Sequence, residues 1–270
     1  MLAALTGCTA GFVYNRIDWV VSWYVGGLVT LDEQQEEELR RLVQQTLRWH
    51  RQSQLPRYVA LLEDLAAAAD EPVTAVDLEG YYQRTVALFD DLLRQVVPAA
   101  VPLLRSLSPG QVAQLRESLA EDNDELWEEY AGETPERRAA RRTKTALRVL
   151  QRFVGKLDGS QRAAVTAGLA PMHDVAESWL DRRRLWQERF LGLLAAPPSE
   201  PIMATALLDL ALDPNQFDPP DYRQQVTANR AIVLGTLAKV SVGLGERQRE
   251  RMRRKFREYA HDLQQLGEVG

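Results

Sequence analysis

The fold follows from one stretch of the sequence, LSPGQVAQL at residues 107–115, which joins a complete helix-start signal to regularly spaced apolar residues. The Ser108 hydroxyl can accept a hydrogen bond from the amide of Gln111, and the Gln111 side chain can reach back to the amide of Ser108, so the two form a capping box. Leu107, just before the cap, can pack on the first turns of the helix as a hydrophobic staple. The stretch therefore predicts a helix that begins at Ser108.

The same signal occurs four times, each with a Leu, a Gln four residues later and an apolar residue four positions beyond the Gln. Helical proteins often contain several well-capped helix starts, but four copies that share Leu and Gln in register indicate an internal repeat. The motif positions are Leu31, Gln35, Leu107, Ser108, Gln111, Leu157, Asp158, Gln161, Leu244 and Gln248.

Almost the whole chain outside these caps is also predicted to be helical, because Ala, Leu, Arg, Glu and Gln dominate and the alternation typical of strands is absent. We predict an all-α protein of about ten helices, arranged as an antiparallel bundle or as a curved cradle. Pro98 and Pro102 fall inside an apolar run and predict a kinked or split helix there. The expected helices are Phe12–Gly26, Asp32–Gln54, Pro56–Ala69, Thr74–Ser106, Ser108–Ala131, Pro135–Leu157, Ser160–Gly168, Met172–Leu194, Pro201–Leu212, Asp221–Val242 and Glu246–Leu266.

The composition restricts the class of protein. With 270 residues, 45% hydrophobic and 26% charged side chains, and a mean hydropathy of −0.32, the chain is not a multi-spanning membrane protein. A net charge of −5 does not favour nucleic acid as a partner. One cysteine and three histidines cannot supply a Cys/His zinc site or an internal disulfide, and we expect no cofactor.

The single cysteine, Cys8, follows Leu5, Thr6 and Gly7 in the order of a bacterial lipoprotein cleavage signal. The alternative is an idle cysteine near a chain end. Only residues 1–5 lie upstream of Thr6-Gly7-Cys8, too few for a basic and apolar leader, so we interpret residues 1–8 as a truncated lipoprotein signal that ends in the lipidated Cys8. Residues 9–270 then form a single elongated helical body, or two lobes that divide near residues 132–157. Thr9, where an Asp would favour inner-membrane retention, points to the outer membrane.

The repeated motif resembles the Leu-Thr/Ser-x-x-Gln motif of the Spy and CpxP family of periplasmic chaperones, small helical proteins with two such motifs per chain. The match is clearest at residues 107–111. Over nearly the whole chain the sequence is also similar to uncharacterised proteobacterial lipoproteins, in segments 14–19, 49–51, 55–58 and 119–123. The Spy resemblance implies that the protein holds client proteins without ATP.

Residues that could carry catalysis are sparse. His50, His173 and His261 belong to three separate predicted helices and lack the companions of a nucleophilic triad or a catalytic zinc site, so the sequence favours a protein that is not an enzyme. An acidic cluster between residues 117 and 129 could bind a divalent cation, but a solvated helix face is favoured. Gly26 and Gly27 indicate a hinge or a helix C-cap.

Two segments are rich in arginine. In the expected helix Pro135–Leu157, we expect the positive charge to be neutralised by the acidic helix before it, across an antiparallel hairpin. The last helix is the better candidate for contact with anionic phospholipid or lipopolysaccharide. Its apolar stripe leaves four arginines outside, and these are the expected contact residues: Arg249, Arg253, Arg254 and Arg257.

Aromatic residues gather shortly after Cys8. Trp19 and Trp23 share one helix face, which we expect to pack into the core, the alternative being an aromatic belt at a membrane surface. The sequence thus predicts a periplasmic protein held at the outer membrane by acylated Cys8, which binds envelope proteins or unfolded clients and not nucleic acid. The alternatives are a structural or envelope-assembly lipoprotein with one dedicated partner, or direct contact with anionic envelope lipid.

Overall fold

The computed structural model of the protein describes residues 14, 16–213, 215–216 and 218–268. The described residues form helices and no strands, which confirms the all-α prediction. Cys8 and the start of the expected helix Phe12–Gly26 lie outside this part of the chain. The elements are α2 (Ile17–Leu28), α3 (Glu33–Trp49), the π-helical segment η1 (His50–Gln54), α4 (Leu55–Ala68), α5 (Ala75–Arg105), α6 (Pro109–Leu126), the π-helical segment η2 (Trp127–Ala131), α7 (Pro135–Val154), α8 (Gly159–Leu169), α9 (Ala176–Ala195), α10 (Glu200–Leu212), α11 (Pro220–Val242) and α12 (Glu246–Glu268).

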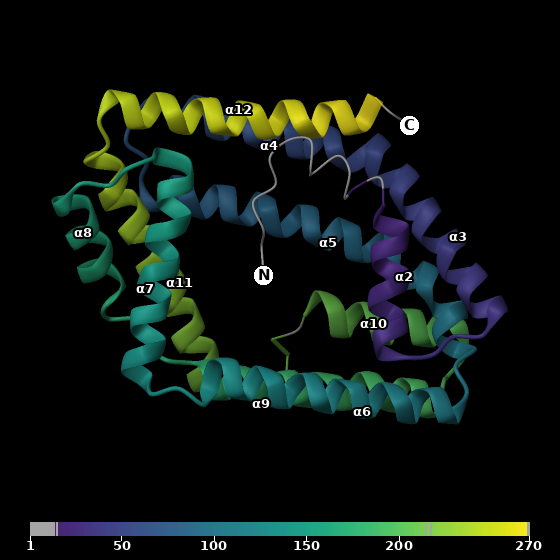
Figure 1. Ribbon diagram of the computed structural model, residues 1–270. Coiled ribbons are helices and arrows are strands. Elements are labelled where there is room, and N and C mark those ends of the chain that lie inside the picture. Colours follow the sequence, from purple (N-terminus) through teal and green to yellow (C-terminus); the bar gives the residue numbers. More distant parts are fainter. Residues whose placement is uncertain (1–13, 15, 214, 217, 269–270) are drawn as a thin grey trace.

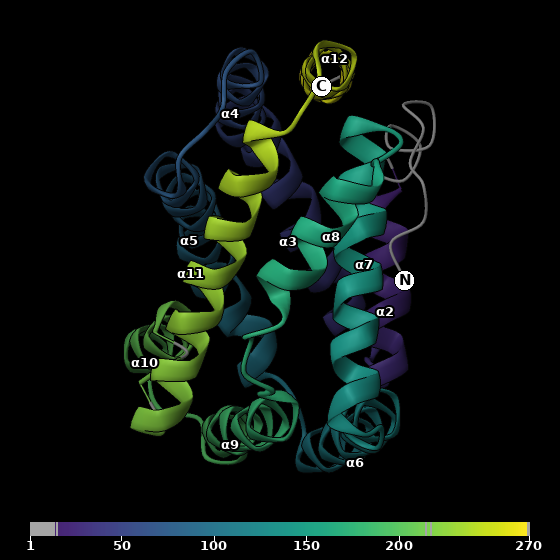
Figure 2. The same cartoon turned by 90° about the vertical axis from the view of Figure 1, so that its left-hand side faces the viewer.

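The helices are arranged as a frame (Figure 1). Helices α4 and α12 pack together along the top, α6 and α9 pack along the bottom, and α2 and α3 form the right-hand side. The left-hand side consists of α7, α8 and α11, while α5 and α10 cross behind. We call the side that faces the viewer in Figure 1 the front of the frame. In Figure 2 the front lies on the right, with α2, α6 and α7, and the back lies on the left, with α4, α5, α10 and α11.

Several helix starts follow the sequence prediction. Asp32, Thr74, Ser108 and Asp158 each accept a hydrogen bond from the amide three residues later, and each donates its own backbone N–H to the side chain of that later residue, which completes a capping box. These side chains satisfy amides that a helix cannot satisfy by itself. At the start of α12 the cap position is Gly245, so only the Gln248 half of the box is present.

Two expected breaks do not divide a helix. Pro98 and Pro102 lie inside α5, which runs unsplit from Ala75 to Arg105. Gly26 and Gly27 lie inside α2 and not at a hinge or C-cap. Conversely, the helix expected from Met172 begins at Ala176. The side chain of Asn229 on α11 binds both the N–H and the C=O of His173, at 2.8 and 2.9 Å, which holds that residue outside the helix.

Buried side chains form two main clusters at opposite ends of the frame. One draws on α2, α5, α6, α9 and α10, and includes Leu115, Leu191 and Met203. The other draws on α7, α8, α11 and α12, and includes Leu157 and Val165. Each motif leucine belongs to one of these clusters or packs against it. The frame therefore has a core at each end, and each core includes two of the four motifs.

The expected hairpin between the acidic and the basic helix is wrong. Helix α6 packs against α9, and α7 packs against α8 and α12. Between α6 and α7 the chain turns a corner of the frame through η2 and the Thr134 cap, so the two helices meet end to end (Figure 1). The acidic residues of α6 therefore do not lie alongside the basic residues of α7.

Candidate functional site

The four motifs form two pairs, which lie at opposite corners of the frame (Figure 1). Where the α2–α3 and α5–α6 junctions meet at the lower right, Leu31–Gln35 pairs with Leu107–Gln111. Where α7–α8 and α11–α12 meet at the upper left, Leu157–Gln161 pairs with Leu244–Gln248. We call these the lower corner and the upper corner.

In the lower corner the two glutamine side chains bind each other reciprocally. The Gln35 amide nitrogen lies 3.2 Å from Gln111 Oε1, and the Gln111 amide nitrogen lies 2.5 Å from Gln35 Oε1. Each glutamine also donates to the backbone carbonyl just before the partner motif, Gln35 to Ser106 at 2.9 Å and Gln111 to Thr30 at 2.8 Å. Each Oε1 still accepts from its own cap amide.

The upper corner repeats this arrangement. Gln161 and Gln248 donate to each other at 2.8 and 3.0 Å. Gln161 donates to the carbonyl of Gly243, the residue before Leu244, and Gln248 donates to the carbonyl of Lys156, the residue before Leu157, at 2.8 and 2.9 Å. Both corners therefore use each glutamine twice, once as a cap on its own helix and once as a bond to the partner motif.

The sequence predicted the caps but missed this pairing. A glutamine in a capping box has a free NH₂ group, and burial of that group requires an acceptor. Gln35 and Gln161 are 5% and 4% exposed, so each needs a distant partner. The even number of copies and their similar separations, 76 residues in the lower corner and 87 in the upper, were the available signals. The motif positions are therefore structural contacts between helix ends.

The four arginines expected to face an anionic surface differ in their surroundings. Arg249 is buried, and its guanidinium donates to the carbonyl of Ser241 at 2.7 Å, at the end of α11. Arg253 forms an ion pair with Asp70 at the end of α4. The expectation that these two are free is wrong, because α12 packs along α4 and its start folds back onto the end of α11.

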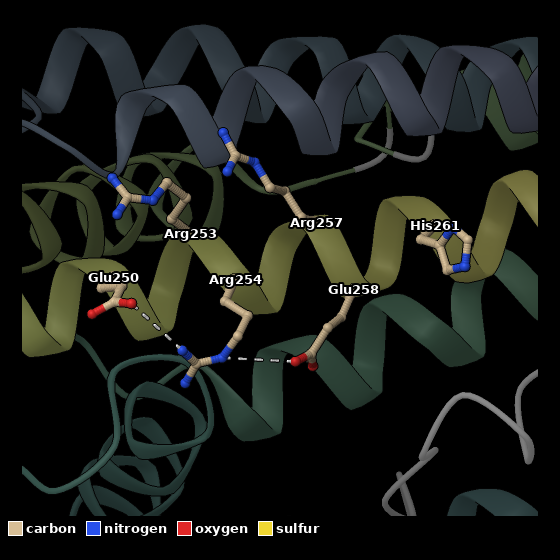
Figure 3. Close-up of a pocket in the computed structure, with 6 residues that line it drawn as sticks. All are labelled: Glu250, Arg253, Arg254, Arg257, Glu258 and His261. Atoms are coloured by element: carbon tan, nitrogen blue, oxygen red, sulfur yellow. Dashed lines mark ion pairs between the residues drawn. The ribbon is translucent and has the colours of Figure 1, made fainter.

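The other two arginines are exposed. Arg254 lies between Glu250 and Glu258 at 4.0 and 3.9 Å, and Arg257 forms no ion pair within the described part of the chain. Both arginines belong to a hollow on the surface of α12, which is lined by Glu250, Arg253, Arg254, Arg257, Glu258 and His261 (Figure 3). In Figure 3, Arg253 and Arg257 extend toward α4, and Arg254 extends to the other side of α12. The hollow therefore presents alternating charges.

Three of the segments that resemble proteobacterial lipoproteins come together around η1. The Tyr14 hydroxyl and His50 Nδ1 are 2.8 Å apart, the His50 ring meets the ring of Tyr58 edge to face at 5.3 Å, and the Arg51 guanidinium lies 5.4 Å from the centre of the Tyr14 ring. Burial lowers the pKa of His50 and raises the pKa of both tyrosines, so all three groups are neutral near pH 7. This cluster joins Tyr14 to the α3–α4 connection.

The fourth such segment, residues 119–123, ends at Asn123. Its amide nitrogen donates to Gln187 Oε1 at 2.6 Å, and its oxygen accepts from Arg183 at 2.8 Å, so Asn123 joins α6 to α9. The neighbouring acidic residues of α6 and η2 are mostly exposed, as a solvated face predicts. Among the described residues, no three His, Cys, Asp or Glu side chains lie close enough to hold a metal ion.

Trp19 and Trp23 do not pack into the core, contrary to expectation. They are 63% and 68% exposed, and their rings stack with centres 6.5 Å apart. Ile17, Val21 and Val25, on the other side of α2, pack against α3 instead. No described helix is both long enough and apolar enough to cross a bilayer.

One comparison with known proteins gives a match. The model of a protein family described as "Family of unknown function (DUF6279)" matches residues 27–223. No curated protein matches the chain. No solved structure matches it either.

Proposed function

The chain belongs to the DUF6279 family of unknown function, and we propose that it is a lipid-anchored, non-catalytic protein of the bacterial envelope that binds other proteins on its helical frame. In this proposal Cys8 is acylated and holds the protein at the periplasmic side of the outer membrane. The frame then acts as an ATP-independent holdase, as the resemblance to Spy suggests. The motif pairs keep the frame together and do not contact clients.

The observation that carries protein binding is an uncovered apolar stripe on α5. Residues Tyr82, Phe89, Val96 and Leu103 are spaced seven apart and therefore share one side of the helix. Leu103 is 7% exposed and Val96 is partly buried, because α3 and α10 pack on α5, but Phe89 is 58% and Tyr82 is 40% exposed. The stripe that forms core at one end of α5 is open at Phe89, and beyond it the Arg230 guanidinium of α11 lies 5.0 Å from the centre of the Tyr82 ring. Exposed large apolar side chains that continue a buried stripe are suited to bind apolar segments of another protein.

The anchor is tested by labelling. With its natural leader, the wild-type protein should incorporate radioactive palmitate and sediment with membranes. Cys8→Ser should abolish the label and release the protein. Wild-type protein without label would overturn the anchor, and the proposed binding of clients would then be judged on its own experiment.

Client binding is tested with the unacylated Cys8→Ser chain and two unrelated proteins that aggregate on heating. Near-stoichiometric amounts should suppress light scattering by both proteins. Phe89→Ser should weaken this suppression, whereas Val76→Ser should not, because Val76 is 81% exposed on the opposite side of the same helix. No suppression of either protein would overturn the holdase and leave an envelope-assembly protein with one dedicated partner.

A further inference from the structure

Helix α7 is the most basic element of an acidic protein. It contains seven Arg and Lys residues and a single acidic residue, Glu136, which gives a net charge of +6, against −5 for the whole chain. Helix α12 has the same number of Arg and Lys residues but five acidic residues, which leaves +2. Positive charge is therefore concentrated on one edge of the frame.

Two of the α7 cations have structural partners. Arg138 is buried, pairs with Asp174 at 2.5 Å and donates to the carbonyls of Ala131 and Glu133. Arg142 lies 3.8 Å from the same carboxylate. These contacts close the corner between η2, α7 and the segment before α9. Arg138 and Arg142 are therefore unavailable to an external partner.

The remaining cations form one exposed stripe. At about 100° per residue, positions 137, 141, 144, 148 and 152 fall within an arc of about 80° and extend over about 22 Å of α7. Arg141 contacts Glu133 at 3.4 Å and the Tyr130 ring. Arg137, Lys144, Arg148 and Arg152 are exposed, and their side chains form no hydrogen bond or ion pair with another described residue. We call these four the α7 basic stripe.

The side of α7 that bears this stripe faces out of the frame. Ala146, Leu150 and Phe153, on the opposite side of the helix, pack into the core formed with α8, α11 and α12. In Figure 2, α8 and α11 lie to the left of α7, on the side toward the back of the frame, so the stripe on the opposite side of α7 faces the front. Helix α2 lies on the same front side of the frame (Figures 1 and 2), with stacked Trp19 and Trp23 on the side away from α3.

From these positions we propose that the front of the frame, formed by the α7 basic stripe and by Trp19 and Trp23, is a docking surface for an anionic lipid bilayer. Arg and Lys side chains are attracted to the negative surface of such a bilayer, and Trp side chains partition into its interfacial layer. Trp19 is eleven residues after Cys8, so an acyl chain on Cys8 would bring α2 to the same bilayer. The inference thus rests on the proposed anchor and adds an orientation to it.

A bilayer fits these observations better than an acidic protein does. The stripe is long, straight and spaced by whole helix turns, which suits a flat array of phosphates. The second contact is a pair of tryptophans on a separate helix at the same side of the frame. A flat bilayer surface can contact the α7 basic stripe and the two tryptophans at the same time, whereas a protein partner would need a surface shaped to fit both.

The experiment is vesicle co-sedimentation of the unacylated Cys8→Ser chain, so that no acyl chain contributes. Vesicles of phosphatidylglycerol and phosphatidylcholine should bind the protein at low salt, and vesicles of phosphatidylcholine alone should bind it weakly. Changing Lys144, Arg148 and Arg152 to Gln should lower the partition coefficient at least about tenfold, because each cation near an anionic surface contributes about fivefold. High salt should remove most of this difference.

The matched control changes Arg247, Arg254 and Arg257 of α12 to Gln. These three residues are exposed, and the control alters the net charge by the same amount. It should change vesicle binding much less than the α7 variant. Changing Trp19 and Trp23 to Ala should reduce binding at both low and high salt. Circular dichroism and melting temperature establish that each variant is folded.

Three outcomes would overturn the inference. One is the absence of binding to anionic vesicles at low salt, which would leave an acidic protein as the partner of α7. Another is an equal loss of binding in the α7 and α12 variants, which would show that only net charge matters. The third is unchanged binding in the tryptophan variant. None of these outcomes depends on palmitate labelling or on client binding. The proposed anchor and the proposed holdase activity are therefore judged by their own experiments.

Discussion

The lower and upper corners of the frame use the same glutamine contacts with different surroundings. Leu31 and Leu107 of the lower corner are partly buried, whereas Leu157 and Leu244 of the upper corner are 0% and 8% exposed. Both helix starts of the lower corner have a side-chain cap, but the upper corner has Gly245 in place of one. The reciprocal glutamine bonds occur in both corners, so they are the invariant part of the motif.

The largest expected effect distinguishes the two corners by their leucines. Leu157→Ala should lower the free energy of unfolding by about 2–5 kcal/mol, because it leaves a cavity in a closed core. Leu107→Ala should cost roughly half as much, since part of that side chain already contacts water. Denaturant unfolding monitored by circular dichroism measures both. Equal losses would contradict the difference in burial between the corners.

The next effect separates the glutamine from the cap within the lower corner. Gln111→Ala should cost about 1–3 kcal/mol, because it leaves the Thr30 carbonyl and the Gln35 side chain without their partner. Ser108→Ala should cost about 1 kcal/mol, as the loss of a cap usually does. Capping alone predicts the reverse order, so the ranking in thermal unfolding decides between a cap and a contact between motifs.

Acid should weaken the upper corner through Asp158. Hydrogen bonds from the Gln161 amide, and then from the Ser160 hydroxyl, hold the pKa of Asp158 below its usual value of about 3.9. The carboxylate therefore stabilises the fold above about pH 4, and this contribution is lost as the pH falls through the lowered pKa. Asp158→Ser should make the melting temperature less sensitive to acid in this range. An unchanged acid dependence would assign the sensitivity to other carboxyl groups.

The smallest effect concerns the missing cap. Gly245→Asp should raise the free energy of unfolding by a few tenths of a kcal/mol, since Gly is itself a tolerable cap residue. A side chain fits there, because a Cβ atom on Gly245 would meet no atom within 4 Å. The control is Gly110→Asp, which makes the same substitution inside the first turn of α6 and not at a cap position. Destabilisation by Gly245→Asp would show that the upper corner requires the glycine.

Local features of the sequence were predictable. The capping boxes at Asp32, Ser108 and Asp158 involve residues three positions apart, so sequence spacing alone contains the required geometry. The pairing of Gln35 with Gln111 was not, since it depends on how helices far apart in the chain meet. The same holds for Trp19 and Trp23, whose spacing gives a shared face but not what covers it.

The basic helices show the same limit for the candidate binding surface. Both α7 and α12 have seven Arg and Lys residues, and the sequence favoured α12 because α7 was expected to be neutralised by the acidic helix before it. In the folded chain Arg249 binds a backbone carbonyl, and Arg253 binds Asp70, which lies just after α4 and about 180 residues away in the sequence. Which cations stay free depends on such distant contacts, so charge counts alone could not show that Arg249 and Arg253 are held by other parts of the chain.

The reciprocal bond between paired motifs is tested most directly by a double-mutant cycle on Gln161 and Gln248. The free energy of unfolding is measured for Gln161→Ala, Gln248→Ala and the double variant. If each glutamine binds the other and its partner's backbone, the double variant should cost less than the sum of the single variants by about 1 kcal/mol or more. Additivity within about 0.3–0.5 kcal/mol would contradict the pairing and reduce the motif to independent helix caps.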